Sequence, residues 1–157
     1  MPVLTIGPRV HNGTHNGAKF HCVLFATDST PESLAAAPYA MSLAQENQAR
    51  LMLLHVIRDH EQRKHQTLGE SSVANVMFKL SELVPKKAEF WCRPEPIVEY
   101  GDPGERILEA ASEHGADLIA LGVRDAAGRL GAATHLSRTT AHKVVAHAGC
   151  PVLTVRN

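Results

Sequence analysis

The chain has 157 residues, with sixteen Lys and Arg against sixteen Asp and Glu, and 44% of its residues are apolar. A chain of this length can bury the core of one domain without metals or disulfides. The balanced charge and the 4% aromatic content argue against nucleic acid and membrane surfaces as partners. No apolar run approaches the ~20 residues of a membrane span.

The three cysteines, Cys22, Cys92 and Cys150, are odd in number and widely spaced. Two of them lie in apolar runs, so we expect buried thiols rather than a disulfide or a metal set. Such thiols are typical of a reducing compartment, and the expected location is the bacterial or archaeal cytoplasm.

The first half of the chain alternates strand and helix signals. Strand-forming runs cover 20–28 and 49–57. Between them, a Ser/Thr pair followed by Pro31 predicts a helix start, and the helical spacing of apolar residues continues beyond Pro38. Because proline lacks an N–H, Pro38 should bend this helix. The stretch 71–84 then predicts an amphipathic helix with one apolar face, made of Val73, Val76, Met77, Leu80, Leu83 and Val84.

The second half continues the alternation. A third strand is expected between 88 and 100, kinked or at a sheet edge because Pro94 and Pro96 interrupt it. Strands at 116–123 and 151–155 flank a helix at 137–149. The helix at 101–115 has a cap, a first-turn proline, a capping-box glutamate and a terminating glycine, which are Asp102, Pro103, Glu105 and Gly115.

Continuous apolar strands separated by helices predict a parallel sheet covered on both faces. Such sheets bind ligands outside the carboxyl ends of the strands, where the strand order reverses. The candidate segments are therefore the "ATDST" loop after the first of these strands, "HVIRD" after the second, and the long loop after the fourth.

The chain also contains a short internal repeat. "MPVLTIGPRV" at 1–10 nearly repeats "CPVLTVRN" at 150–157. We interpret the first copy as the last strand of a preceding related domain, joined through a polar linker at 11–19.

The order of strand, "ATDS", helix, strand ending in "HV", and final "AHAGCPVLTV" resembles the universal stress protein family over about Lys19–Asn157. The resemblance implies an α/β, Rossmann-like fold: a five-stranded parallel sheet in the order 3-2-1-4-5 with helices on both faces. To this we add the extra N-terminal strand. It also implies a homodimer or domain pairing through the last strand. By this resemblance, we expect the N-terminal copy to pair antiparallel with Val152–Val155, either within one chain or by exchange with a neighbour, because an unpaired apolar edge strand is a liability. We divide the chain into an arm and linker at 1–18 and a family domain at 19–157.

Some members of that family bind ATP, and these resemble one another in carrying G-x2-G-x9-G-[ST] across the fourth loop. By this resemblance, the base and ribose would lie beside the ends of the first two strands and the phosphates against the fourth loop. The implied binding residues are Ala26, Thr27, Asp28, Val56, Gly122, Arg124, Asp125, Arg138, Thr139 and Thr140.

The fourth loop departs from the ATP-binding pattern. Gly122 holds the first glycine position, but Asp125 stands at the second and Arg138 at the third, with Thr139 as the hydroxyl. A carboxylate ~5 Å from a phosphate charge costs roughly 3 kcal/mol at an effective dielectric near 20, about a hundredfold in affinity. One well-placed arginine offsets a similar amount, and the candidates are Arg124, Arg129, Arg138 and His135. The site is therefore expected to be altered.

Asp28 has two interpretations: a ligand for the ribose and base, or a cap for the helix that follows it. Three functions remain open at this point. The first is a stress-response regulatory module with an altered adenine-nucleotide site, and the second is a nucleotide-free dimerising scaffold with an unknown protein partner. The third is a slow ATPase, which we do not favour, because no general base or pair of metal-binding carboxylates is visible.

Overall fold

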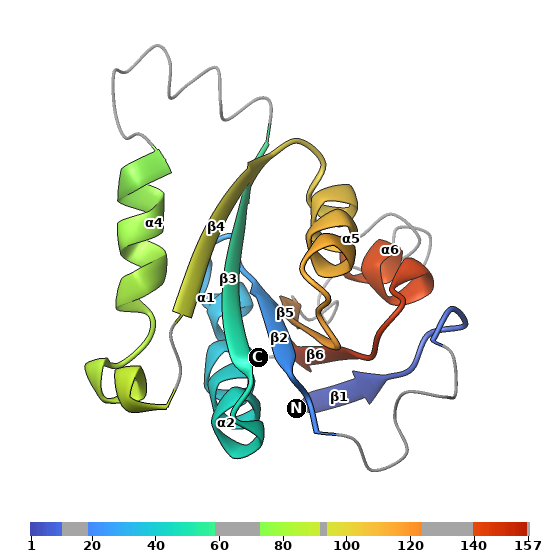
Figure 1. Cartoon of the computed structure of the whole chain (residues 1–157). Coiled ribbons are helices and arrows are strands. Elements are labelled where there is room, and N and C mark those ends of the chain that lie inside the picture. Colours follow the sequence, from blue (N-terminus) through green and yellow to red (C-terminus); the bar gives the residue numbers. More distant parts are fainter. Residues whose placement is uncertain (11–18, 59–72, 92–93, 124–139, 157) are drawn as a thin grey trace.

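The computed structural model of the chain describes residues 1–10, 19–58, 73–91, 94–123 and 140–156. These residues form a sheet in the order β1-β6-β5-β2-β3-β4 (Figure 1). The strands are β1 (Pro2–Thr5), β2 (Cys22–Ala26), β3 (Arg50–Ile57), β4 (Pro94–Tyr100), β5 (Leu118–Val123) and β6 (Val152–Arg156). Strands β2 to β6 run parallel in the predicted order, and β1 is antiparallel to β6. The predicted fold class is confirmed.

Helices cover the two faces of this sheet (Figure 1). One face carries α1 (Pro31–Leu34), α2 (Ala37–Asn47), α4 (Val73–Glu82) and the 3-10 helix η1 (Lys86–Phe90), and the other carries α5 (Pro103–Glu113) and α6 (Thr140–His147). In β2, Val23 and Phe25 pack on the first side and Leu24 and Ala26 on the second. The central strand β2 is apolar throughout because both of its faces are buried.

The helix expected to bend at Pro38 is instead two helices, so that prediction was wrong in form. α1 ends at Leu34 and α2 begins at Ala37, with Pro38 in the first turn of α2. A proline in a first turn loses no helical hydrogen bond, whereas in mid-helix it would. The residue that caps α1 is Thr30, whose side chain accepts from the N–H of Ser33. As a result, α1 is a separate helix of four residues.

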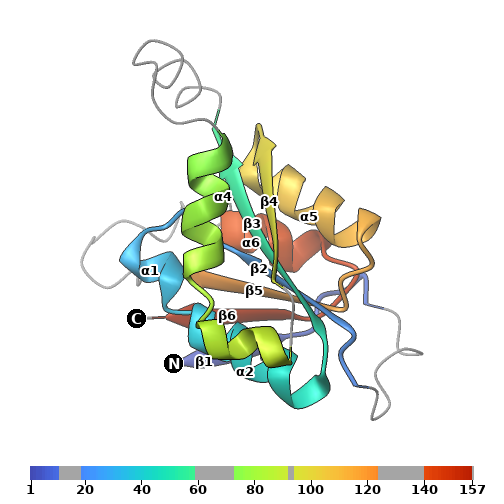
Figure 2. The same ribbon diagram turned by 60° about the vertical axis from the view of Figure 1, so that its left-hand side comes forward.

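Two further expectations concern the β3–β4 side of the sheet. β4 is an edge strand, as its two prolines predicted. The apolar face predicted for α4 is only partly buried: Leu80 and Val84 are covered, while Met77 is 37% exposed. α4 lies over the sheet edge formed by β3 and β4 (Figure 2), so it has too little sheet beneath it to cover the whole face.

The N-terminal strand pairs as predicted. β1 lies antiparallel to β6, with Pro2 opposite Val155 and Thr5 opposite Val152 (Figure 2). The segment after β1 adds a contact that the sequence did not predict. Val10 is 9% exposed, and Gly7 lies so close to α6 that a Cβ there would come within 2.5 Å of the Val145 carbonyl oxygen.

The described cysteines are buried thiols, as predicted. Cys22 is 3% and Cys150 7% exposed, and neither is in a disulfide. Burial raises the pKa of the Cys150 thiol to about 11, since the thiolate would lose its hydration. Cys92 lies outside the described residues. Within the described ranges, no helix is long and apolar enough to cross a membrane, and no cluster of three metal-binding side chains occurs.

Candidate functional site at the carboxyl ends of β2 and β5

The strand order reverses between β2 and β5. β2 pairs with β3 on one side and with β5 on the other, and Ala26, the last residue of β2, lies opposite both Leu54 and Leu121. The chain leaves β2 toward α1 and leaves β5 toward α6, which are on opposite faces of the sheet. In parallel sheets of this kind, ligands bind outside the carboxyl ends of two strands whose connections diverge in this way.

The turn after β2 is held by its own hydroxyls. The hydroxyl of Thr27, which is buried, lies 2.8 Å from the Ser33 hydroxyl and accepts from the N–H of Ser29 at 3.0 Å. Ser29 adopts a left-handed conformation, with φ of 64°. Such a φ is costly for a residue other than glycine, so the surrounding hydrogen bonds must hold it there.

Asp28 projects from this turn and is exposed. Its Oδ1 accepts from the Thr30 N–H at 3.0 Å and from the Thr30 hydroxyl at 2.6 Å. Thr30 in turn caps α1, so Asp28 orients the cap and is not the cap itself. The interpretation of Asp28 as the cap was therefore wrong, whereas the Ser/Thr cap expected before Pro31 is confirmed in Thr30.

Gly122 lies against the backbone of α1. A Cβ at this position would overlap the Glu32 carbonyl oxygen and would lie 2.5 Å from the Ser33 Cα and 2.6 Å from the Ser33 oxygen. Only a glycine allows β5 and α1 to come this close. Gly122 and Thr27 thus both interact with α1 at Ser33: Gly122 packs against the Ser33 backbone, and the Thr27 hydroxyl is hydrogen-bonded to the Ser33 hydroxyl.

Ala26 and Val56 lie on the other face of the sheet from Thr27. Both belong to the core cluster beneath α5 and α6, at 6% and 8% exposure. The backbone of Thr27 continues the ladder, since its N–H donates to the Leu54 carbonyl at 2.9 Å. The side chains of Ala26 and Val56 are packing groups, so any contact with a ligand would come from their backbone.

The remaining predicted residues belong to the connection from β5 to α6. Thr140 is the first residue of α6 and is half-buried. Arg124, Asp125, Arg138 and Thr139 lie outside the described residues. The described part of the site is therefore the turn after β2, the end of β5 and the beginning of α6.

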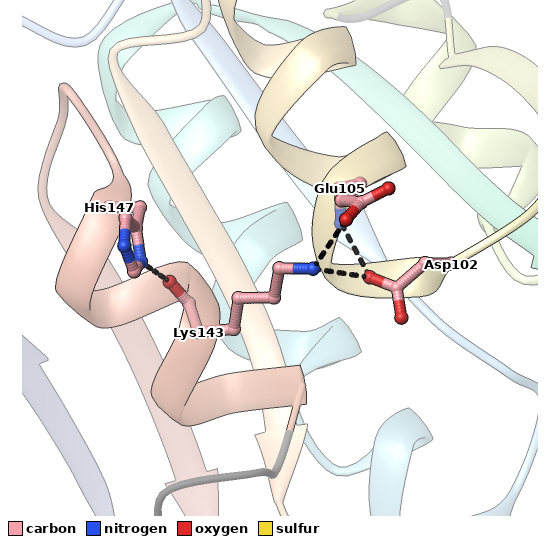
Figure 3. A network of polar contacts seen from close by, with 4 residues as sticks. All are labelled: Asp102, Glu105, Lys143 and His147. Carbon is pink, nitrogen blue, oxygen red and sulfur yellow. Dashed lines mark hydrogen bonds and ion pairs between the residues drawn. The ribbon is translucent and has the colours of Figure 1, made fainter.

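Lys143, near the beginning of α6, forms ion pairs with two carboxylates at the beginning of α5 (Figure 3). Lys143 Nζ donates to Asp102 Oδ1 and to Glu105 Oε1, at 2.9 Å each. Gly104 makes this possible, because a Cβ there would lie 2.6 Å from Cδ of Lys143. The Lys143 ammonium and then the Glu105 N–H lower the pKa of Asp102, and the two carboxylates raise the pKa of Lys143.

The sequence signals for these contacts were incomplete. Asp102 was expected as the cap of α5, and it does accept from the Glu105 N–H at 3.0 Å. Glu105 was expected to complete a capping box, but its carboxylate accepts from Lys143 instead. Ser33 and Lys143 were not singled out, and their only local signal is that each lies in the first turn or two of a helix.

The fold is a doubly wound α/β domain whose strand order reverses at the carboxyl ends of β2 and β5, the place where domains of this kind bind ligands. A family model described as "Universal stress protein family" matches residues 19–156. The chain belongs to the universal stress protein family.

Two curated relatives match this chain over nearly their whole length. Universal stress protein YxiE of Bacillus subtilis is 32% identical over 150 residues, covering 87% of this chain and 99% of that protein. A universal stress protein of Thermus aquaticus is 34% identical over 147 residues, covering 87% and 99%.

Solved structures of the family share the fold. A universal stress protein in complex with cAMP has a TM-score of 0.67 at 18% identity, over 88% of this chain and 98% of its own. One from Archaeoglobus fulgidus in complex with dAMP has a TM-score of 0.58 at 13% identity, over 87% and 98%. Another from Archaeoglobus fulgidus has a TM-score of 0.74 at 21% identity and covers all of this chain but 50% of its own. At these identities the likeness concerns the fold.

Proposed function

We propose that this protein is a regulatory module of the stress response that binds an adenine nucleotide, ATP or a relative of it, without turning it over. The observation that carries the proposal is the switch point between β2 and β5, with an exposed carboxylate at the end of β2. Two structural neighbours in complex with cAMP and dAMP support the choice of an adenine nucleotide.

Asp28 is the residue to which we assign the base and ribose. Its Oδ1 is held by Thr30, which orients the carboxylate, and the side chain remains accessible to solvent. A carboxylate accepts hydrogen bonds from ribose hydroxyls or from an exocyclic amine. Beside it, the buried Val56 can offer its backbone but no polar side-chain atom.

The phosphate side of the site is where this chain is altered. α1 is four residues long, and Thr30 already accepts from its Ser33 N–H. Lys143 is neutralised by two carboxylates. We therefore assign the phosphates to the N-terminus of α6 at Thr140 and to Arg124, Arg138 and Thr139, with Asp125 opposing them.

One observation favours the second candidate, a nucleotide-free scaffold. The glycine at position 122 is fully explained by the close approach of α1, so it does not by itself indicate a phosphate. In this alternative the turn after β2 is a structural turn, and the protein acts through association with itself or with a partner.

The first experiment asks whether the purified protein carries a nucleotide. The protein is denatured and the released small molecules are identified by mass spectrometry. Calorimetric titration with ATP, AMP and cAMP then measures affinity for the wild type and for Asp28→Asn. We expect Asp28→Asn to weaken binding about tenfold, as the loss of one or two hydrogen bonds to a charged group would.

Asp125 provides the sharper test. Asp125→Asn removes its charge and Asp125→Gly also restores the family glycine; both should tighten ATP by about one to two orders of magnitude. Glu113→Gln is the matched control. It also removes one negative charge, but from the last residue of α5, at the end of the sheet where the parallel strands begin. Equal affinity in all variants would exclude Asp125 from the phosphate site, and no binding by any of them would favour the scaffold.

A further inference from the structure

β1 and β6 share a tetrapeptide. Pro2–Thr5 reads PVLT, and residues 151–154 read PVLT again. These two copies are neighbours in the structure, because β1 and β6 pair with each other along the edge of the sheet. The two copies of the repeated sequence are therefore paired strands in the structure.

The register of this pair is symmetric. Leu4 lies opposite Leu153, with Val3 opposite Thr154 and Thr5 opposite Val152. The two leucines hold the same place in the tetrapeptide, so the ladder has a local two-fold axis between them. Two copies of β6 would pair in the same register, with Leu153 opposite Leu153 of a second copy. An interface of this kind is self-complementary and closes as a dimer.

Besides its ladder with β6, β1 is held to the domain at its two ends. At one end, the Met1 amino group donates to the Arg156 carbonyl at 2.6 Å, and the Arg156 N–H donates to the Met1 carbonyl at 3.2 Å. At the other, Gly7 and Val10 pack into the domain. Between them, the side chains of β1 contribute less, since Val3 and Leu4 are 44% and 53% exposed.

We propose that β1 occupies, within one chain, the place that β6 of a second copy would take, and so controls association of this protein with itself. While β1 is docked, the β6 edge is covered. When β1 is displaced, the backbone edge of β6 is open, and β6 is itself a well-buried strand, in which Val152 and Val155 are 0% and 3% exposed. Open apolar edges pair with other strands, and the strand that fits this edge in register is another β6.

The test releases β1 without changing β6. Gly7→Val places a side chain against the Val145 carbonyl, and Val10→Asp puts a charge at a buried anchor. Both variants are made in the full chain, and their folding is checked by circular dichroism. Two independent variants keep the test valid if one of them fails to fold.

The readout is a cross-link that reports the register. In a β6–β6 pair, the two copies of residue 153 face each other at a non-hydrogen-bonded position, about 4.5 Å apart at Cα, which a disulfide can span. Leu153→Cys is therefore combined with each release variant and also made alone. We expect at least about tenfold more 153–153 disulfide in the release backgrounds, identified by peptide mapping, together with a dimer in sedimentation.

Two controls separate this interface from others. The Arg156 N–H points to β1, and so, by the alternation of the ladder, does that of Thr154. Thr154→Pro removes that donor and should abolish the cross-link in a release background. Leu4→Cys with Leu153→Cys should instead close a bond within one chain and keep it monomeric. The proposal is overturned if folded release variants show no increase, if wild-type and release backgrounds cross-link equally, or if cross-links form in another register.

Discussion

The Gly122→Ala substitution tests whether the glycine at the end of β5 is held by packing. The added Cβ would lie 2.5 Å from the Ser33 Cα and 2.6 Å from the Ser33 oxygen, and it would also overlap the Glu32 carbonyl. These are backbone atoms, so no side chain can rotate away, and α1 must move as a unit. A shift of α1 also pulls Ser33 from the buried Thr27 hydroxyl.

The expected cost follows from these contacts. Overpacking costs typically 1–3 kcal/mol, and a clash with backbone belongs at the upper end, so we expect about 3 kcal/mol. In a domain of this size that lowers the melting temperature by about 6–12 °C. Urea unfolding followed by circular dichroism measures the free energy of unfolding directly.

Two other glycines provide a graded control series. A Cβ at Gly149 or at Gly115 would meet nothing within 4 Å, but Gly115 has φ of +66°. Gly149→Ala should change stability by less than about 0.5 kcal/mol. Gly115→Ala should cost about 1 kcal/mol through backbone strain alone. If Gly122→Ala unfolds at the same urea concentration as Gly149→Ala, α1 does not constrain residue 122, and the glycine would have to be explained by a ligand.

Three further predictions follow from single contacts. Thr27→Val keeps the shape of a buried side chain but removes the acceptor of the Ser29 N–H, so it should lower the free energy of unfolding by about 1–2 kcal/mol in urea titrations; an unchanged value would contradict this. The pKa of Asp102 is lowered in the folded state, chiefly by Lys143, so its stabilising effect is present above the unfolded pKa of about 4 and lost as pH falls through the folded value. The difference in urea midpoint between wild type and Lys143→Met should therefore be full at pH 6 and vanish on acidification, and a pH-independent difference would refute it. Finally, Cys150, with its pKa raised to about 11, should resist alkylation at pH 8 until the protein unfolds, as followed by mass spectrometry; rapid labelling of the native protein would refute its burial.

Local and periodic features of the chain determined the sheet. Apolar runs without alternation predict strands buried on both faces, and intervening helices force their parallel arrangement. Pro94 and Pro96 indicated that β4 lies at an edge, because a proline has no N–H to donate and is tolerated where that side of the strand has no neighbour. The repeated PVLT, together with the last-strand pairing that the family resemblance implies, predicted the partner of β1, since an unpaired apolar edge strand is a liability. For the site, the sequence indicated the carboxyl ends of β2 and β5, where the strand order does reverse, and the turn that contains Asp28.

Tertiary packing decided which residue does what at that end. Gly122 and Ser33 are far apart in the sequence, and no local pattern indicates that β5 and α1 touch there. Lys143 likewise bonds the beginning of α5 instead of facing a ligand, because Gly104 leaves room for its side chain. Capping and hydrophobic period depend on residues within a turn or two, and the sequence states them directly. Close approach between distant segments depends on how whole elements are placed, and only the folded chain decides that.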